Sequence, residues 1–244
     1  MKRVVLLGAS NVRRGLTTIA RLAIGEGAEE IVGAIGHGRS YGKRSCILFR
    51  CLPGILECGV WDALARQPPD DTAAVIADVG NDILYGETPA TILGWVSECL
   101  GRIQARQVSI LGLPLPRLRS LGPARFSLFR SIFFPTSRVP RGLTLSATEA
   151  VDAGLRRLAQ RFGARFVEPS ESWYGVDPIH IRRRSREEAW RRILATTAPA
   201  MSLATGDALR LRLAAPERRW IAGVERRREQ PAWTGPGGTV VTLY

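Results

Sequence analysis

The chain has 244 residues, of which 45% are hydrophobic, and its formal net charge is +13. This length and composition suit one α/β domain with a full core, and no apolar run approaches the ~18 residues that a membrane-spanning helix needs. Four cysteines without a C-x-x-C pair and only two histidines argue against a structural zinc site. We therefore expect no metal and no transmembrane segment.

The positive charge comes almost entirely from arginine, because Lys2 and Lys43 are the only lysines. Such an excess permits non-specific attraction to nucleic acids or acidic lipids. No zinc-finger pattern, aromatic RNA-binding motif or sustained heptad accompanies it, so we expect no specific nucleic-acid partner. The N-terminus leads directly into a strand pattern, without the cleavage site of a signal peptide. A cytoplasmic location is therefore expected, with all the cysteines as reduced thiols.

In chain order, the first predicted element is a strand at residues 4–7, where consecutive apolar residues indicate burial on both faces. Gly8 ends this run, and the side chains of Ser10 and Asn11 are expected to cap a helix over residues 12–24. The next predicted elements are a strand at 30–35, a glycine-rich loop at 36–42, two short helices within 45–66, and a loop rich in proline and aspartate at 68–71.

The alternation of strand and helix continues through the rest of the predicted domain. Further strands are predicted at residues 73–79, 107–113 and 165–168, and further helices at 88–104, 146–162 and 185–199. Strands that alternate with helices in this way predict a parallel sheet that is covered by helices on both faces.

Two regions do not follow this pattern. In residues 114–147, Phe126, Phe129 and Phe133 recur at helical spacing with arginines between them. Such a stripe fits either a core-facing helix or a lid over a site, which would accept an acyl chain or touch a membrane surface. Residues 201–244 favour strands, among them the alternating run at 209–213, and we expect them to form a β-rich extension of a domain at 1–200. This extension would either pack on the domain or mediate homo-oligomerisation.

Short polar motifs follow several of the predicted strands. They are Gly-Ala-Ser-Asn at 8–11, Gly-His-Gly-Arg-Ser at 36–40, Gly-Asn-Asp at 80–82 and Asp-Pro-Ile-His at 177–180. Each motif alone has an ordinary explanation as a helix cap or a turn. Open α/β sheets, however, bind ligands at the carboxyl ends of their strands, so four such motifs together indicate one site.

In this order the motifs resemble those of the SGNH hydrolases, also called the GDSL esterase/lipase family, over residues 3–198. The resemblance implies a three-layer α/β/α sandwich with a flavodoxin-like, five-stranded parallel sheet. It also implies hydrolysis or transfer of an acyl group carried as a carboxylic ester, without a metal or other cofactor. The expected partner is a small-molecule ester substrate.

The resemblance also implies the role of each site residue. Ser10 would be the nucleophile, His180 its base, and Asp177 the group that orients the imidazole, which is the logic of a catalytic triad. The amides of Ser10 and Gly38 and the side chain of Asn81 would form the oxyanion hole.

Some positions depart from the family pattern. Ala9 and Asn11 stand where the family usually has aspartate and leucine on either side of the serine. Gly36 competes with Gly38 for the oxyanion amide, and Gly38 is favoured because Gly-Arg-Ser is closer to the family's Gly-x-Ser/Thr. Candidate substrate contacts are Asn11, His37 and Arg39.

These residues leave more than one function open. The first hypothesis is a serine esterase, and the second is an acyltransferase or carbohydrate O-acetyl esterase that uses the same residues. A third is a non-catalytic basic protein that binds nucleic acid or acidic lipid through its arginines. A dinucleotide-binding role is disfavoured, because residues 8–11 lack the later glycines of that fingerprint.

Overall fold

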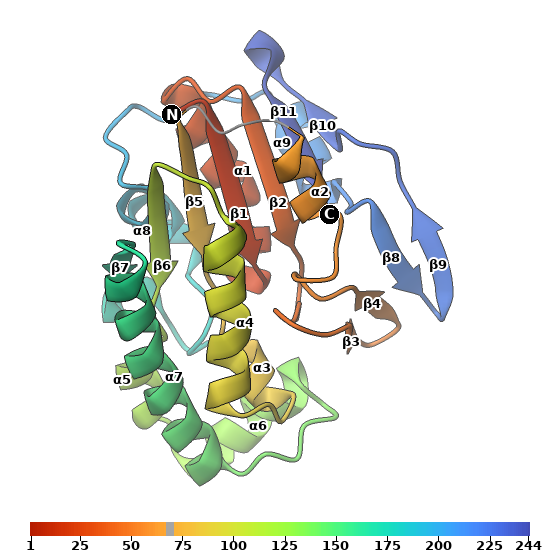
Figure 1. The fold of residues 1–244 in the computed structure, drawn as a ribbon. Helices are drawn as coiled ribbons and strands as arrows, with labels where there is room; N and C mark the ends of the chain where they lie inside the picture. Colours follow the sequence, from red (N-terminus) through yellow and green to blue (C-terminus); the bar gives the residue numbers. More distant parts are fainter. Residues whose placement is uncertain (67–70) are drawn as a thin grey trace.

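The structure is a computed structural model that describes residues 1–66 and 71–244. Its centre is a seven-stranded sheet in the order β10-β11-β2-β1-β5-β6-β7 (Figure 1). The strands are β1 (Arg3–Gly8), β2 (Glu30–Ile35), β5 (Thr72–Ile76), β6 (Gln107–Leu111), β7 (Arg165–Val167), β10 (Trp233–Thr234) and β11 (Val240–Leu243). The strands β2-β1-β5-β6-β7 are the five that the sequence predicts, all parallel and in the flavodoxin-like order.

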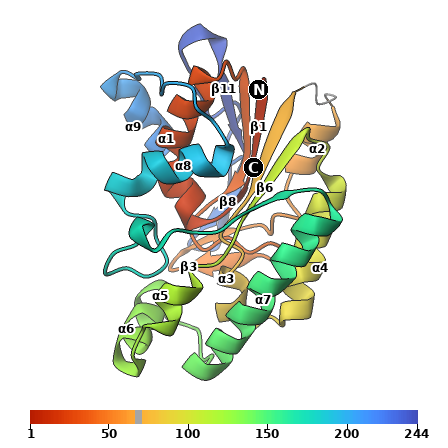
Figure 2. The same ribbon diagram turned by 90° about the vertical axis from the view of Figure 1, so that its left-hand side faces the viewer.

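Helices cover both faces of this sheet, which Figure 2 shows edge-on between them. One layer holds α1 (Ser10–Gly25), α8 (Arg186–Leu194) and α9 (Thr205–Leu213), and the other holds α2 (Val60–Ala65), α4 (Pro89–Arg102) and α7 (Arg141–Arg161). Strand β1 explains why two layers are needed: Val4 and Leu6 face the first layer, whereas Val5 and Leu7 face the second. Burying one such side chain contributes about 1.5–3 kcal/mol, so the continuous apolar run of β1 requires cover on both sides.

Shorter elements lie at the carboxyl ends of the parallel strands. They are α3 (Asn81–Leu84), α5 (Leu115–Arg119), α6 (Pro123–Phe133) and short 3₁₀ helices at Glu171–Trp173 and Arg183–Ser185; a third 3₁₀ helix, at Pro236–Gly238, precedes β11 at the amino ends of the strands. The predicted helix at 146–162 begins earlier, at Arg141, because Pro140 supplies the extended residue before its first turn. Across the described ranges, no helix is both long and apolar enough to cross a membrane.

The two short helices predicted within 45–66 are partly wrong. Strands β3 (Ser45–Ile47) and β4 (Arg50–Leu52) form a hairpin, and only the end of this segment is helical, as α2. The expectation of reduced thiols is also wrong for Cys46 and Cys51, which face each other across the hairpin and form a disulfide. Cys58 and Cys99 are free. Of the loop predicted at 68–71, only Asp71 belongs to the described residues.

The C-terminal segment joins the main sheet. Strand β11 pairs in parallel with β2, and β10 pairs with β11, while β8 (Arg218–Ile221) and β9 (Val224–Arg227) extend the β3–β4 hairpin into a second, four-stranded sheet. The strand suggested by the alternation at 209–213 is wrong, since these residues belong to helix α9. Only Leu211 of this run is buried, so its leucines do not form one buried face.

Candidate active site

Ser10 lies at the junction of β1 and α1, at the carboxyl edge of the central sheet. The strand ends at Gly8, where a Cβ would lie 2.6 Å from Val12 Cγ2 and 2.9 Å from the Ala77 carbonyl oxygen, so only glycine fits this turn. Ser10 is the first residue of the helix and retains 8% of its surface. Its hydroxyl therefore lies at the helix N-terminus, where the backbone amides and the helix dipole favour negative charge.

The expected capping of α1 by Ser10 and Asn11 is wrong, because the amides at the start of this helix donate instead to a carboxylate that follows a neighbouring strand. Asp78 accepts hydrogen bonds from the amides of Ala9 (3.0 Å), Asn11 (2.9 Å) and Val12 (3.2 Å). Asp78 has a φ of 61°, in the left-handed region that aspartate tolerates better than most residues. The sequence analysis missed Asp78, which stands just outside the Gly-Asn-Asp motif. Its only signal is an acidic residue directly after a buried strand.

The side chains of Ser10, His180 and Asp177 meet although 170 residues separate the first from the second. His180 Nε2 lies 2.9 Å from Ser10 Oγ, and His180 Nδ1 lies 2.7 Å from Asp177 Oδ2. The other oxygen of Asp177 accepts hydrogen bonds from the amides of Ile179 (3.1 Å) and His180 (3.2 Å), which fixes the turn between them. Burial acts to raise the pKa of Asp177, but the hydrogen bond and charge of His180 hold it below its ordinary value.

Asn11 ties this turn to the start of α1. Its Nδ2 donates to Asp78 Oδ1 (2.7 Å) and to the carbonyl oxygen of Ile179 (2.9 Å), and its Oδ1 accepts from the amide of Ile181 (2.8 Å). These bonds hold the residues on both sides of His180. Asn11 also lines the cavity beside Ser10, so the expected substrate contact remains a prediction, but its side-chain polar groups already have protein partners.

Two predicted oxyanion donors are placed differently relative to Ser10. Asn81, the first residue of α3, lines the same cavity as Ser10, and its Nδ2 is buried with no hydrogen-bond partner among the described residues. Gly38 has a φ of 63° in the loop after β2, and a Cβ there would lie 2.2 Å from Ile47 Cδ1. A Cβ at Gly36 would also clash, 2.1 Å from Leu52 Cδ1. Gly38 therefore needs glycine because of its left-handed backbone, whereas the Cβ at Gly36 meets only the end of the Leu52 side chain, and the role of Gly38 remains a prediction.

The other two candidate substrate contacts differ in exposure. His37 is exposed in the loop between the two glycines, where the loss of water around its ring and the charges of Arg14, Arg13 and Arg50 lower its pKa to about 4. Arg39 is fully buried, and its guanidinium donates to the carbonyl oxygens of Pro53 (3.1 Å) and Tyr244. The expected contact of Arg39 with substrate is therefore wrong: this side chain fastens the loop to the C-terminal segment.

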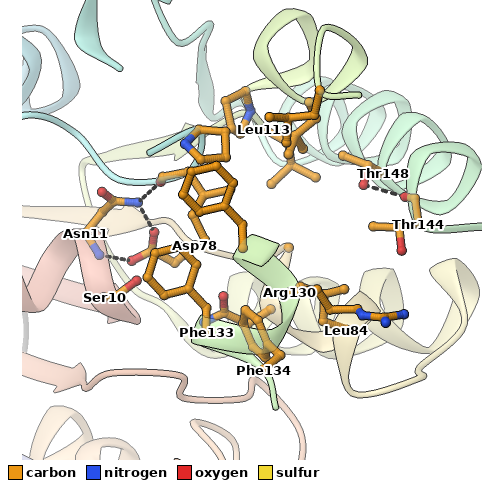
Figure 3. Close-up of a pocket in the computed structure, with 18 of the residues that line it drawn as sticks. Ser10, Asn11, Asp78, Leu84, Leu113, Arg130, Phe133, Phe134, Thr144 and Thr148 are labelled. Atoms are coloured by element: carbon orange, nitrogen blue, oxygen red, sulfur yellow. Dashed lines mark hydrogen bonds between the residues drawn. The ribbon is translucent and has the colours of Figure 1, made fainter. Parts of the chain in front are cut away.

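A cavity of about 100 Å³ opens beside Ser10 and runs under the segment at 114–147. In Figure 3, Phe133 and Phe134 lie near Ser10, and Thr144 and Thr148 lie at the far end. The Phe133 ring meets the His180 ring edge-on, with 4.9 Å between centroids. Most of the lining is apolar, from Leu84, Leu111, Leu113, Pro114, Leu118, Leu121, Phe126, Phe129, Phe133 and Phe134. The phenylalanine stripe is thus part of a cavity wall.

No family model matches the sequence, and no curated protein sequence matches it. Among solved structures, the chain is similar to the inhibitor-bound aryl esterase of M. smegmatis, with 18% identity, a TM-score of 0.50, and 78% of this chain and 95% of that chain covered. It is also similar to a protein from Lactobacillus plantarum, with 15% identity, a TM-score of 0.51 and coverage of 80% and 95%. These likenesses confirm the predicted α/β/α fold and, at the level of the fold, the resemblance inferred from the sequence.

Proposed function

We propose that this chain is a serine hydrolase of the SGNH type that cleaves carboxylic esters with an apolar acyl group. The observation that carries the proposal is the convergence of Ser10, His180 and Asp177 at 2.9 and 2.7 Å. A serine hydroxyl becomes a good nucleophile when a base can take its proton, and histidine is the side chain best suited to that exchange near neutral pH.

In the first half of the reaction, Ser10 Oγ attacks the ester carbonyl carbon and gives its proton to His180 Nε2. Asp177 holds the opposite ring nitrogen and stabilises the imidazolium that forms. When the bond to the leaving alcohol breaks, His180 donates the proton to that oxygen, which leaves an acyl-serine. Water then attacks the acyl carbon while His180 takes one of its protons. The bond from that carbon to Ser10 Oγ breaks, the proton passes from His180 to Ser10 Oγ, and the carboxylic acid leaves.

The negative charge that forms on the carbonyl oxygen needs donors that are already in place. The Ser10 amide is at the N-terminus of α1, and Asn81 offers a buried Nδ2 with no protein partner among the described residues. We assign the remaining position to the Gly38 amide. Removing one such donor typically costs about 3–4 kcal/mol of transition-state stabilisation.

The cavity favours a particular part of the substrate. The leucine and phenylalanine side chains of its wall offer no hydrogen bonds to a polar group of the substrate. The cavity begins beside Ser10. The acyl chain therefore occupies the cavity, with its carbonyl carbon at Ser10, because burial of apolar surface contributes about 25 cal/mol per Å².

The proposal is tested by covalent labelling with a fluorophosphonate and by hydrolysis of p-nitrophenyl butyrate. The expected result is a single adduct mapped to Ser10, and a loss of kcat of about 10³-fold or more in Ser10→Ala and His180→Ala. Ser202→Ala, which changes an exposed serine, is the matched control and should keep both labelling and rate. Undiminished hydrolysis by Ser10→Ala, in a protein with unchanged circular dichroism, would refute the proposal.

A further inference from the structure

The small sheet carries three arginines on one face. Arg219 on β8 stands directly opposite Arg226 on β9, and Arg50 on β4 pairs with Ile221, two residues along β8 from Arg219. Because side chains alternate between the faces of a strand, all three arginines lie on the same face. We call Arg50, Arg219 and Arg226 the arginine row.

This arrangement is unfavourable for the protein alone, since like charges placed opposite each other destabilise a pair of strands. On the opposite face of the same strands, the repulsion between Arg218 and Arg227 is relieved because Glu225 accepts hydrogen bonds from both. On the face of the arginine row, no carboxylate among the described residues lies within 4.0 Å of any member. The Nε of Arg50 is buried with no partner there.

The face with the arginine row is turned toward the active site. Ile47 and Leu52 belong to it, through the pairings of β3 with β4, and they touch the loop at Gly38 and Gly36. Arg50 lies between them on the same hairpin. It is close enough to His37, in that loop, for its charge to contribute to the lowered pKa of the imidazole.

Positive charge continues from the sheet to the triad itself. Arg14, on the first turn of α1 after Ser10, has its Nη1 3.8 Å from Asp177 Oδ2. Arg13 and Arg50 repel each other strongly enough to contribute to a lowered pKa of Arg13, after burial as the larger cause. Arg13 and Arg14 on α1 therefore add positive charge to that of the arginine row on β4, β8 and β9.

The arginine row and the acyl cavity lie on different sides of the site. The cavity wall comes largely from the segment at 114–147 and from α7, and none of the row is among the residues described as lining it. Figure 1 shows α5 and α7 at the lower left, α6 at the bottom, and β8 and β9 at the right. The arginine row is therefore available to a part of the substrate that lies outside the acyl cavity.

On the basis of the proposed function, we propose that the leaving group of the substrate carries phosphate-class anions, which the arginine row binds. Guanidinium groups match phosphate oxygens with two parallel hydrogen bonds, and β4, β8 and β9 place three of them across about 10 Å. A multiply charged alcohol or thiol portion would span this distance and supply the negative charge that the face lacks.

The test compares butyryl esters of three phenols: 4-hydroxyphenyl phosphate, the neutral 4-hydroxybenzamide and the cationic 4-hydroxyphenyl-trimethylammonium. The wild type should prefer the phosphate ester over the neutral ester by ~10-fold in kcat/KM and disfavour the cationic one, and 0.5 M salt should reduce the preference. Arg219→Gln and Arg50→Gln should each reduce the phosphate-to-neutral ratio by ~5-fold or more. Arg227→Gln, on the opposite face of the same strands, should keep it.

The outcomes separate the two proposals. Hydrolysis of the neutral ester without a preference for the phosphate ester, or a preference that Arg219→Gln and Arg227→Gln change equally, overturns the assignment of the arginine row and leaves the esterase intact. Failure to hydrolyse any of the three esters overturns the proposed function, and this inference with it.

Discussion

Asn11 shows how much of the site depends on a residue with no obvious chemistry. Its side chain holds Asp78 and the backbone on both sides of His180, so it sets the position of the imidazole relative to Ser10. The sequence predicts Asn11 only as a helix cap and a candidate substrate contact. Its positioning role could not be predicted, because the partners Ile179 and Ile181 reach it only after folding.

Asn11→Leu should therefore lower kcat by ~10²-fold with little change in KM, since an ångström of misplacement in a triad costs about that much. The variant Asn11→Asp distinguishes a role in positioning His180 from a merely structural role. Its carboxylate would face Asp78, so activity relative to wild type should rise as the pH falls and one of the two is protonated. Steady-state rates between pH 5 and 8 check this, and a constant ratio between variant and wild type would contradict it.

Asp82 stands beside Asn81 and introduces a pH-dependent cost to folding. It is fully buried, its Oδ2 accepts a hydrogen bond from the Tyr41 amide (2.9 Å), and burial raises its pKa from 3.8 to about 6. The native state thus binds this proton more tightly than the unfolded chain. Stability from Asp82 is greatest below pH 3.8 and falls as the pH rises to about 6.

Asp82→Asn should remove this dependence, because the amide is neutral at every pH and its oxygen still accepts from Tyr41. The free energy of unfolding of the variant minus that of the wild type should increase by about 2 kcal/mol between pH 4 and pH 7. Urea titrations at four pH values measure it, and parallel curves for the two proteins would show that Asp82 does not titrate in this range.

At the scale of single residues, the sequence identified the side chains whose chemistry is distinctive. Ser10, His180 and Asp177 could be selected because their motifs, taken in chain order, resemble those of the SGNH hydrolases. Asp78 could not, because its importance comes from a left-handed backbone and from amides of another strand end. Arg39 was misjudged for the same reason: it belongs to the glycine-rich motif expected at the site, while its guanidinium reaches Tyr244.

Among the elements, helix α6 decides the character of the cavity. The spacing of Phe126, Phe129 and Phe133 predicts a helix correctly, but helical periodicity is the same whether the apolar stripe faces a core or a binding cavity. Only the placement of α6 over the strand ends decides between the two. Phe126 is buried, and Phe133 meets both the cavity and the ring of His180.

Phe133→Ala should therefore lower kcat/KM for a hexanoyl ester by ~10-fold or more, because it removes a wall of the acyl cavity and an edge contact with the base. The loss for an acetyl ester should be smaller, since a short chain leaves most of the cavity unused. Ile132→Ala, on the exposed side of the same helix, is the matched control. Equal losses for both esters would indicate that Phe133 acts only through His180.

The hairpin of β3 and β4 and the helix α9 were predicted with the wrong structure, for related reasons. Both segments are short, and in both the local pattern competes with partners distant in sequence. The β3–β4 hairpin pairs with β8 and is closed by the Cys46–Cys51 disulfide. The carbonyl oxygens near the end of α9 accept hydrogen bonds from Arg13, on α1.

At the scale of the whole molecule, the contacts of residues 201–244 can be compared with the predicted boundary between a domain at 1–200 and an extension. Strand β11 extends the main sheet beside β2, Val241 is fully buried there, and Trp233 packs in the same core as helix α1. The same segment supplies the Tyr244 carbonyl to Arg39 and two strands of the face that holds the arginine row. These contacts tie residues 201–244 to the main sheet and to the loop after β2.

Val241→Asp tests whether this segment folds with the rest. A carboxylate at this position would be buried without a cationic partner in the described core, at a cost of about 3–5 kcal/mol, and calorimetry should show one transition at a lower temperature. Labelling of Ser10 by a fluorophosphonate should disappear at that same temperature. Leu209→Asp, which changes an exposed leucine of α9, should leave the transition nearly unchanged. If the segment were a separable extension, the strands that position Ser10, Asn81 and His180 would keep their own core. In Val241→Asp, Ser10 would then be labelled up to the same temperature as in the wild type.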